Sequence, residues 1–342
     1  MVMKRKNKRK IKHQKWLNKR DYHVFIKRTK RNNSHKKYNS KRKNIKVTLI
    51  TPENFSLINN TEETMKFFMD FIENVKKEEY GKEFYIDSSN VKKVTVDAII
   101  YLIAVMRNPN TNITMKYRYT GNFPQNEEAQ RIFQTSGFTK YVHSNAKKLP
   151  SSTENMTIMS GLKNDPEIAK ECCLFVMNKL KKTRKDVMPL QGVLIELMSN
   201  VYLHAYEKNS FMIKSWFIYA EHIDDCVRIV FVDTGQGIAK TVRKNFYEKI
   251  QNIIGVAVKE FAIKDEVLLE SVFRGDFRTS TRERHRGNGL KSVKEKITNS
   301  IFSKFEVISG KGKCSISSSG EIFSRLGYNN TIYGTLFTFE IR

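Results

Sequence analysis

The segment GVLIELMSNVYLHA, residues 192–205, carries the pattern that decides the fold of this chain. Its polar residues Glu196, Asn200 and His204 follow one another at intervals of four. On a helix each is therefore turned about 40° from the last, and all three lie along one stripe. The residues between them are mostly apolar, which predicts a helix packed around most of its circumference. We expect the helix to begin near Pro189, because proline is favoured in a first turn.

A second motif follows this helix. Two strands are predicted at 214–221 and 226–232, and the second leads into FVDTGQGI, residues 231–238. A carboxylate at the end of a strand, here Asp233, can direct its oxygens at a ligand, and following glycines let that ligand approach the backbone. Such a short motif is also typical of an ordinary turn.

Two further motifs complete the C-terminal half. RGNGLKSVK, residues 286–294, places glycines ahead of a predicted helix, where unpaired N–H groups and the helix dipole favour an anion such as phosphate. The chain ends in GTLFTFEI, residues 334–341, which alternates like a strand. Residues 278–286 are rich in arginine and hydroxyl groups. They are either a solvated basic loop or a clamp for phosphates, since arginine pairs with phosphate in a bidentate manner.

Taken in order, the motifs E-x-x-x-N-x-x-x-H-A, D-x-G-x-G, G-x-G-L and G-T-x-F resemble the nucleotide site of the GHKL superfamily, named for gyrase, a heat-shock chaperone, histidine kinases and MutL. The resemblance covers residues 161–342. It implies a GHKL (Bergerat) α/β sandwich with ATP and Mg²⁺ as its cofactors.

The resemblance implies a role for each matching polar residue. Glu196 matches the catalytic position that activates the attacking water in members that hydrolyse ATP, and Asn200 would help to hold Mg²⁺. A carboxylate one helical turn from a metal-binding asparagine is where a general base for an in-line water would need to stand. Because Mg²⁺ prefers oxygen ligands and keeps several waters, one amide carbonyl with phosphate oxygens suffices. His204 matches a position that mainly packs and hydrogen-bonds.

The remaining matches concern the nucleotide itself. By the resemblance, Asp233 would contact the adenine amine, and Thr335 would sit beneath the adenine beside it. The positions that would line the base pocket or meet the phosphates are Gly235, Gly237, Gly287, Gly289 and Leu290.

The N-terminal half has a different pattern. The pattern of residues 47–148 predicts strands and helices in alternation, which indicates a small α/β layer domain. The predicted elements are strands 46–50, 84–86 and 113–119 and helices 61–77, 96–106 and 126–142. A polar stretch at 149–160 is expected to be a linker.

This half resembles the anti-sigma-factor-antagonist (STAS) fold. The resemblance rests on YIDSSNV (85–91), VTVDAIIYL (94–102) and IFQTSGF (132–138). In that family a phosphate-accepting serine stands just before the second helix, and Val96 and Asp97 occupy that place here. A protein partner that binds through this domain is one expectation from the resemblance.

The charge of the chain is concentrated at its start. Residues 1–46 hold 20 of the 62 Lys and Arg residues and one of the 35 acidic residues, so 19 of the 27 formal positive charges lie there. We expect this segment to be a disordered basic tail. It is either a solvated extension or an arm that binds nucleic acid through its phosphates.

Composition also bears on location. The longest apolar runs are too short for a signal peptide or a membrane span, and the four cysteines form no C-x-x-C pair. These features favour the cytoplasm, with buried thiols.

Three functions remain open at this stage. The first is an ATPase or an ATP-gated switch that acts through the STAS-like domain, a partner or a homodimer. The second is a serine/threonine protein kinase of the anti-sigma-factor type, which the STAS-like domain favours and the missing serine weakens. The third is a nucleic-acid-binding module with a nucleotide-sensing site. A sensor histidine kinase is disfavoured, because no helical hairpin before residue 189 presents a histidine.

Overall fold

The computed structural model describes residues 45–76, 82–107, 118–142, 152–205, 215–243, 263–275, 289–298, 301–327 and 330–342. The predicted basic tail lies outside these residues except for its last two positions, 45 and 46. Gly287 and the basic segment 278–286 also lie outside them. We call residues 45–142 the N-terminal unit and residues 152–342 the C-terminal unit.

The N-terminal unit is an α/β layer built on a parallel sheet with the strand order β1-β3-β5. Its strands are β1 (Ile45–Ile50), β2 (Asn54–Phe55), β3 (Lys82–Asp87), β4 (Lys93–Val94) and β5 (Arg118–Gly121). Its helices are α2 (Thr61–Lys76), α3 (Val96–Arg107), α4 (Glu127–Thr135) and a 3-10 turn at Phe138–Lys140. The predicted alternation of strand and helix is confirmed for the described residues; of the strand predicted at 113–119, residues 113–117 lie outside them and 118–119 belong to β5. Strands β2 and β4 pair as a separate small sheet.

The last helix of this unit is shorter than predicted. We expected one helix over 126–142, but α4 ends at Thr135. Gly137 has a φ of +87°, a left-handed conformation that glycine adopts readily and that ends a helix. Apolar residues recur after Gly137 because the chain forms a 3-10 turn there. Their spacing is close to that of an α-helix, which is why a longer helix was predicted.

Asp97 has a structural role at the start of α3. Its side chain is buried, and Oδ2 accepts hydrogen bonds from the backbone N–H groups of Leu57 at 2.6 Å and Ile58 at 3.1 Å. Burial raises the pKa of this carboxyl. Through these two hydrogen bonds Asp97 holds the loop after β2 against the start of α3.

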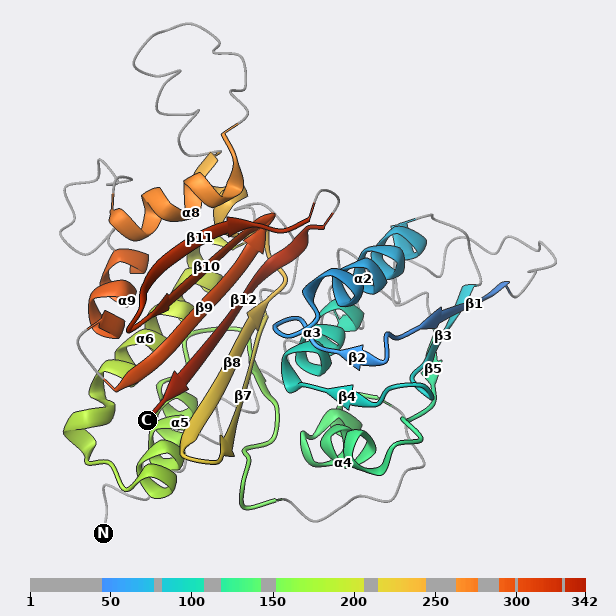
Figure 1. The fold of residues 1–342 in the computed structure, drawn as a ribbon, viewed down its shortest axis with the longest axis horizontal. Coiled ribbons are helices and arrows are strands. Elements are labelled where there is room, and N and C mark those ends of the chain that lie inside the picture. Colours follow the sequence, from blue (N-terminus) through green and yellow to red (C-terminus); the bar gives the residue numbers. More distant parts are fainter. Residues whose placement is uncertain are drawn as a thin grey trace, which may run out of the picture.

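The C-terminal unit is built on a seven-stranded antiparallel sheet with the order β11-β10-β9-β12-β8-β7-β6. Its strands are β6 (Met159–Gly161), β7 (Trp216–Ile223), β8 (Cys226–Asp233), β9 (Phe302–Gly310), β10 (Gly312–Ser317), β11 (Gly320–Arg325) and β12 (Ile332–Ile341). Its helices are α5 (Pro166–Leu180), α6 (Arg184–His204), α8 (Asp265–Arg274) and α9 (Gly289–Thr298). A mixed α/β fold with several sheets is thus confirmed (Figure 1).

Helix α6 begins five residues before the predicted start. Thr183 caps it: its hydroxyl accepts from the Asp186 N–H, and the Asp186 carboxylate accepts from the Thr183 N–H at 2.8 Å. This capping box satisfies two backbone N–H groups at the start of the helix, and Pro189 lies inside the helix. A proline there removes one intrahelical hydrogen bond, which the rest of a 21-residue helix tolerates.

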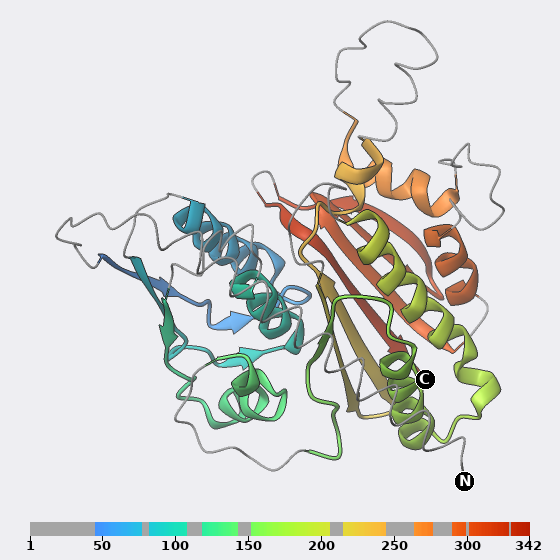
Figure 2. The same ribbon diagram turned by 180° about the vertical axis from the view of Figure 1, so that it is seen from behind.

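The large sheet is covered on both faces. One face packs against α5, α6 and α9, as the view from behind shows (Figure 2). The other face packs against α3 of the N-terminal unit, which contacts β7, β8 and β12. The sheet residues in this second core include Phe217, Tyr219, Val230, Val232 and Leu336. The two units therefore share one apolar core, and α3 is buried from Val96 to Met106.

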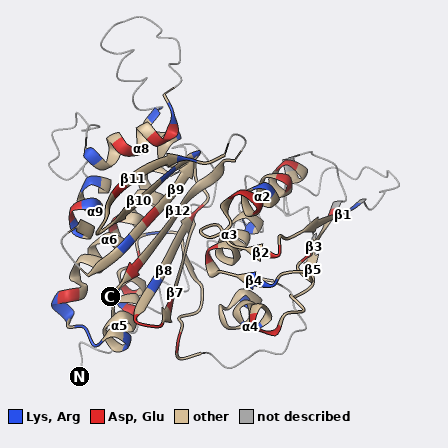
Figure 3. Cartoon of the chain, in the orientation of Figure 1, with Lys and Arg blue, Asp and Glu red and all other residues tan. Residues whose placement is uncertain are grey.

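The charges of the described residues are spread over the outside of both units. Figure 3 shows acidic and basic residues interspersed on α2 and α8. All four cysteines are buried and free, as predicted. Among the helices that the structure describes, none is both long enough and apolar enough to cross a membrane.

Candidate functional site

Asp233 is the last residue of β8, a central strand of the large sheet. It pairs in register with Thr335 on β12 and with Trp216 on β7. Only 4% of its surface is exposed, and its Oδ1 accepts a hydrogen bond of 2.8 Å from the N–H of Gly235. Burial raises the pKa of Asp233 to about 6, although its hydrogen bonds with Gly235 and Thr335 act in the opposite direction. The fold thus holds a carboxylate out of water at the end of a strand.

The loop after Asp233 lies between α6 and β12, with no room for side chains at its glycines. A Cβ on Gly235 would lie 2.3 Å from the carbonyl oxygen of Ala205, at the end of α6. A Cβ on Gly237, whose φ is +79°, would lie 2.9 Å from the carbonyl oxygen of Gly334. The N–H of Gln236 donates to Ala205 O at 2.7 Å. The loop is therefore held against both neighbours by its backbone.

Ser309, at the end of β9, is part of the same cluster, although the sequence analysis did not identify it. Its hydroxyl accepts from the N–H of Ile238 at 2.7 Å and donates to Gly334 O at 3.3 Å. It also lies 3.5 Å from the hydroxyl of Thr335, its partner in register. A serine just before Gly310 was the available signal, and it could not be told from ordinary turn chemistry. We call Asp233, Gly235, Gly237, Ser309 and Thr335 the Asp233 cluster.

Glu196 and Asn200 form a second group with the start of α9. Both are half-buried on α6, one helical turn apart, as the spacing predicted. A Cβ on Gly289 would lie 2.3 Å from Glu196 Oε1 and 3.3 Å from Asn200 Oδ1. A side chain at this position would displace the Glu196 carboxylate, so glycine lets α9 begin against these two side chains as they stand. We call Glu196, Asn200 and Gly289 the Glu196 group.

The Asn200 amide has capacity for a ligand. One of its two polar atoms, Nδ2, is buried and has no hydrogen-bond partner among the residues that the structure describes. The two amide atoms of an asparagine are assigned from their hydrogen bonds, so either the oxygen or the nitrogen can occupy this place. A buried amide atom without a hydrogen-bond partner is unfavourable, so a ligand that binds to it here would supply the missing partner.

Two other predicted residues lie beside these groups. Leu290, the second residue of α9, is half-buried against the core that contains α6. His204 is exposed at the last position of α6. Among the described residues, no group of three or more His, Cys, Asp or Glu side chains is placed to hold a metal ion.

Helix α6 contacts both groups. Ala205, at its end, lies against the loop of the Asp233 cluster, and the Ala205 N–H donates to the backbone carbonyl of Asn200 at 3.2 Å. Glu196 and Asn200, earlier on the same helix, lie against Gly289 at the start of α9. The two groups are thus linked through one helix, although their residues are far apart in the sequence.

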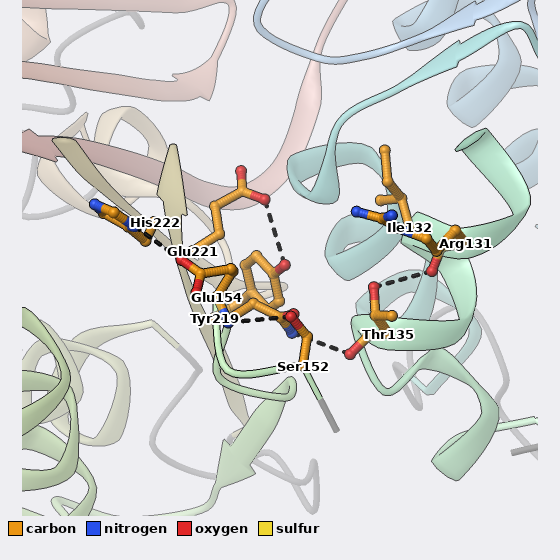
Figure 4. A pocket seen from close by; sticks show the side chains of 9 residues that line it. Arg131, Ile132, Thr135, Ser152, Glu154, Tyr219, Glu221 and His222 are labelled. Carbon is orange, nitrogen blue, oxygen red and sulfur yellow. Dashed lines mark hydrogen bonds and ion pairs between the residues drawn. The ribbon is translucent and has the colours of Figure 1, made fainter. Parts of the chain in front are cut away.

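A cavity of about 430 Å³ lies elsewhere, where α4 of the N-terminal unit faces β7 (Figure 4). None of the predicted site residues lines it. Its acidic groups already have partners: Glu154 pairs with His222 at 2.9 Å and with Lys179 at 2.8 Å, and Tyr219 bonds Glu221 at 3.3 Å. The two contacts of Glu154 hold the segment before β6 against β7 and α5.

The chain shows no match to a protein-family model and no significant match to a curated protein.

Proposed function

We propose that this chain binds Mg-ATP at the Asp233 cluster and the Glu196 group, and that it acts as an ATPase or an ATP-gated switch of the GHKL type. The observation that supports the proposal is that one helix, α6, lies against both a loop that carries a buried, hydrogen-bonded carboxylate and, through its Glu/Asn pair, a helix that starts with glycine. An ordinary turn and a solvated helix face, the alternative interpretations of these motifs, do not require this arrangement.

The Asp233 cluster would bind the base. The Gly235 N–H and the Thr335 side chain orient the carboxylate, and its remaining lone pairs would accept from an exocyclic amine. Because Asp233 is buried, such a bond would form in a site of low dielectric, where it is stronger than in water. The absence of side chains at Gly235 and Gly237 lets the loop lie against α6 and β12, which holds it beside the Asp233 carboxylate.

The Glu196 group would bind the phosphates and the metal. Asn200 would supply an oxygen ligand to Mg²⁺, which would neutralise phosphate charge. The start of α9 would offer backbone N–H groups to the phosphate oxygens. Glu196, which lies against that helix start, would accept the proton of the attacking water.

The fate of the γ-phosphate tests this proposal. The purified protein is incubated with Mg²⁺ and γ-labelled ATP, and the label is resolved into free phosphate and protein. We expect free phosphate from the wild type, and a rate lower by about 10² to 10⁴-fold in Glu196→Ala with ATP binding retained. Glu171→Ala, which removes an exposed carboxylate from the neighbouring α5, is the control.

The other outcomes discriminate between functions. Equal rates in wild type and Glu196→Ala would exclude Glu196 as the base. Label on the protein itself would contradict hydrolysis and favour the protein kinase alternative. ATP binding without release of label would favour the switch.

A further inference from the structure

A tyrosine of the N-terminal unit contacts the backbone next to the Asp233 cluster. Tyr101, in the middle of α3, is 1% exposed. Its hydroxyl donates to the carbonyl oxygen of Tyr333 at 3.1 Å and accepts from the N–H of the same residue at 2.9 Å. Burial raises the pKa of Tyr101 far above its ordinary value, so the hydroxyl stays protonated and can make both bonds.

The backbone of Tyr333 needs such a partner because the sheet is irregular there. The register of β12 against β9 jumps from Ile332–Gly310 to Thr335–Ser309. Tyr333 and Gly334 thus form a bulge, and bulged residues stand outside the regular hydrogen-bond ladder. Buried backbone groups that leave a ladder require other partners. The Tyr101 hydroxyl supplies one to each polar group of Tyr333.

This bulge sets the position of Thr335 relative to Asp233. Gly334 has a φ of +82°, and a Cβ on it would lie 2.0 Å from the carbonyl oxygen of Asp233. Ser309 holds the Gly334 carbonyl from the side of β9. Tyr101 holds the preceding residue from the side of the N-terminal unit. A shift of the bulge would therefore move Thr335 away from the carboxylate that it contacts.

The direction of the Tyr101 hydroxyl is itself fixed by packing. The ring meets Phe68 of α2 edge to face, with centroids 4.7 Å apart and planes at 89°. The backbone of α3 around it is buried on the large sheet. The ring can therefore not swing away from β12 without opening the shared core.

We propose that Tyr101 is a positioning residue, through which the N-terminal unit holds the bulge of β12 and so controls recognition of the adenine base. This inference rests on the proposed nucleotide function. Tyr101 acts through Tyr333, Gly334 and Thr335 and does not touch the nucleotide.

Nucleotide binding by Tyr101→Phe tests the inference. The variant removes one oxygen and keeps the ring in the core. Dissociation constants are measured for Mg-ATP and Mg-ITP, because ITP lacks the exocyclic amine that Asp233 would bind. We expect Tyr101→Phe to weaken ATP binding about five- to tenfold and ITP binding much less, so that the preference for ATP falls.

Tyr141→Phe is the matched control. The Tyr141 hydroxyl also donates from the N-terminal unit to a backbone carbonyl, that of Ile158 at 3.0 Å, and Ile158 is neither in the bulge of β12 nor in the Asp233 cluster. We expect this variant to keep the affinity for both nucleotides and the preference for ATP.

Amide hydrogen exchange gives a second readout that needs no nucleotide. Exchange at Tyr333 should be at least about tenfold faster in Tyr101→Phe, because its N–H loses its acceptor. The role of Tyr101 would be overturned if amide exchange at Tyr333 were unchanged in Tyr101→Phe. It would also be overturned if the preference for ATP over ITP were unchanged, including the case in which both affinities fall equally. Failure of the wild type to bind ATP would contradict the proposed function, whereas wild-type binding with an unchanged Tyr101→Phe variant would contradict this inference alone.

Discussion

Asp233 is a carboxylate that the fold buries at the end of a central strand, with one oxygen bonded to Gly235. Burial of a charged group is unfavourable unless partners compensate for it. The raised pKa, about 6, indicates that the two hydrogen bonds compensate only in part. A ligand that donates a further hydrogen bond to this carboxylate would supply further compensation, so the residue is suited to binding.

The pH dependence of stability should report this burial. The folded pKa of Asp233 lies above its ordinary value of 3.8, so the protonated form is favoured by folding. Its contribution to the free energy of unfolding is fully present below about pH 4 and is lost as the pH rises through about 6. The loss is up to about 3 kcal/mol. Urea unfolding of the protein without nucleotide should therefore show that Asp233→Asn becomes more stable relative to wild type over this range. If the difference in free energy of unfolding between wild type and Asp233→Asn did not change with pH, this would contradict the burial of the Asp233 carboxylate.

Gly334 should be intolerant of a side chain for two separable reasons. Gly320→Ala measures the effect of a positive φ alone, because its φ is +119° and a Cβ there would meet nothing within 4 Å. It should lower the free energy of unfolding by about 1 kcal/mol. Gly334→Ala adds a clash with the Asp233 carbonyl and should lower it by about 3 kcal/mol or more. Equal losses in denaturant unfolding would mean that the two strands do not approach so closely.

At the scale of elements, the capping box of α6 defines where the helix that carries Glu196 begins. Thr183→Ala should lower the free energy of unfolding by about 1 kcal/mol, because the first turn loses its side-chain acceptor. Thr135→Ala, whose hydroxyl bonds a carbonyl one turn back in α4, should have a smaller effect. A helix that began near Pro189 would leave Thr183→Ala as stable as wild type.

The elements show which features a single sequence predicts. Spacing of four along residues 192–205 placed Glu196 and Asn200 on one stripe of α6, because helical periodicity is local. The predicted start of α6, near Pro189, was wrong. The capping box at 183–186 starts the helix five residues earlier, and this outweighs the preference of proline for a first turn. The predicted end of α4 was wrong because the apolar spacing was extended across Gly137, whose left-handed φ of +87° ends the helix.

At the scale of the whole molecule, the two units are joined by an apolar interface that local patterns did not predict. The sequence showed that residues 96–106 are apolar all round, which indicates burial but not the partner. The partner is the sheet face formed by β7, β8 and β12, which lie more than 100 residues further along the chain. For the same reason neither Tyr101 nor Ser309 was expected near Asp233. Long-range contacts of this kind leave no periodic signal.

Separation of the units should therefore be destabilising. A fragment of residues 152–342 would expose the face that includes Phe217, Val230 and Leu336, all buried under α3 in the full chain. An exposed apolar face of a sheet favours aggregation. We expect this fragment to elute as aggregates in gel filtration, whereas residues 45–342 should remain dispersed. A monomeric fragment with the melting temperature of the full chain would contradict the shared core.

Equilibrium binding of Mg-ATP to the full chain is the measurement that tests the central claim most directly. Titration calorimetry would compare wild type with Asp233→Asn and with Asp225→Asn, whose carboxylate is on the surface. We expect wild type and Asp225→Asn to bind ATP alike, and Asp233→Asn to bind about 10- to 150-fold more weakly, since a charge-assisted hydrogen bond contributes about 1.5 to 3 kcal/mol. No binding by the wild type, or equal affinity in Asp233→Asn, would contradict a nucleotide site at Asp233.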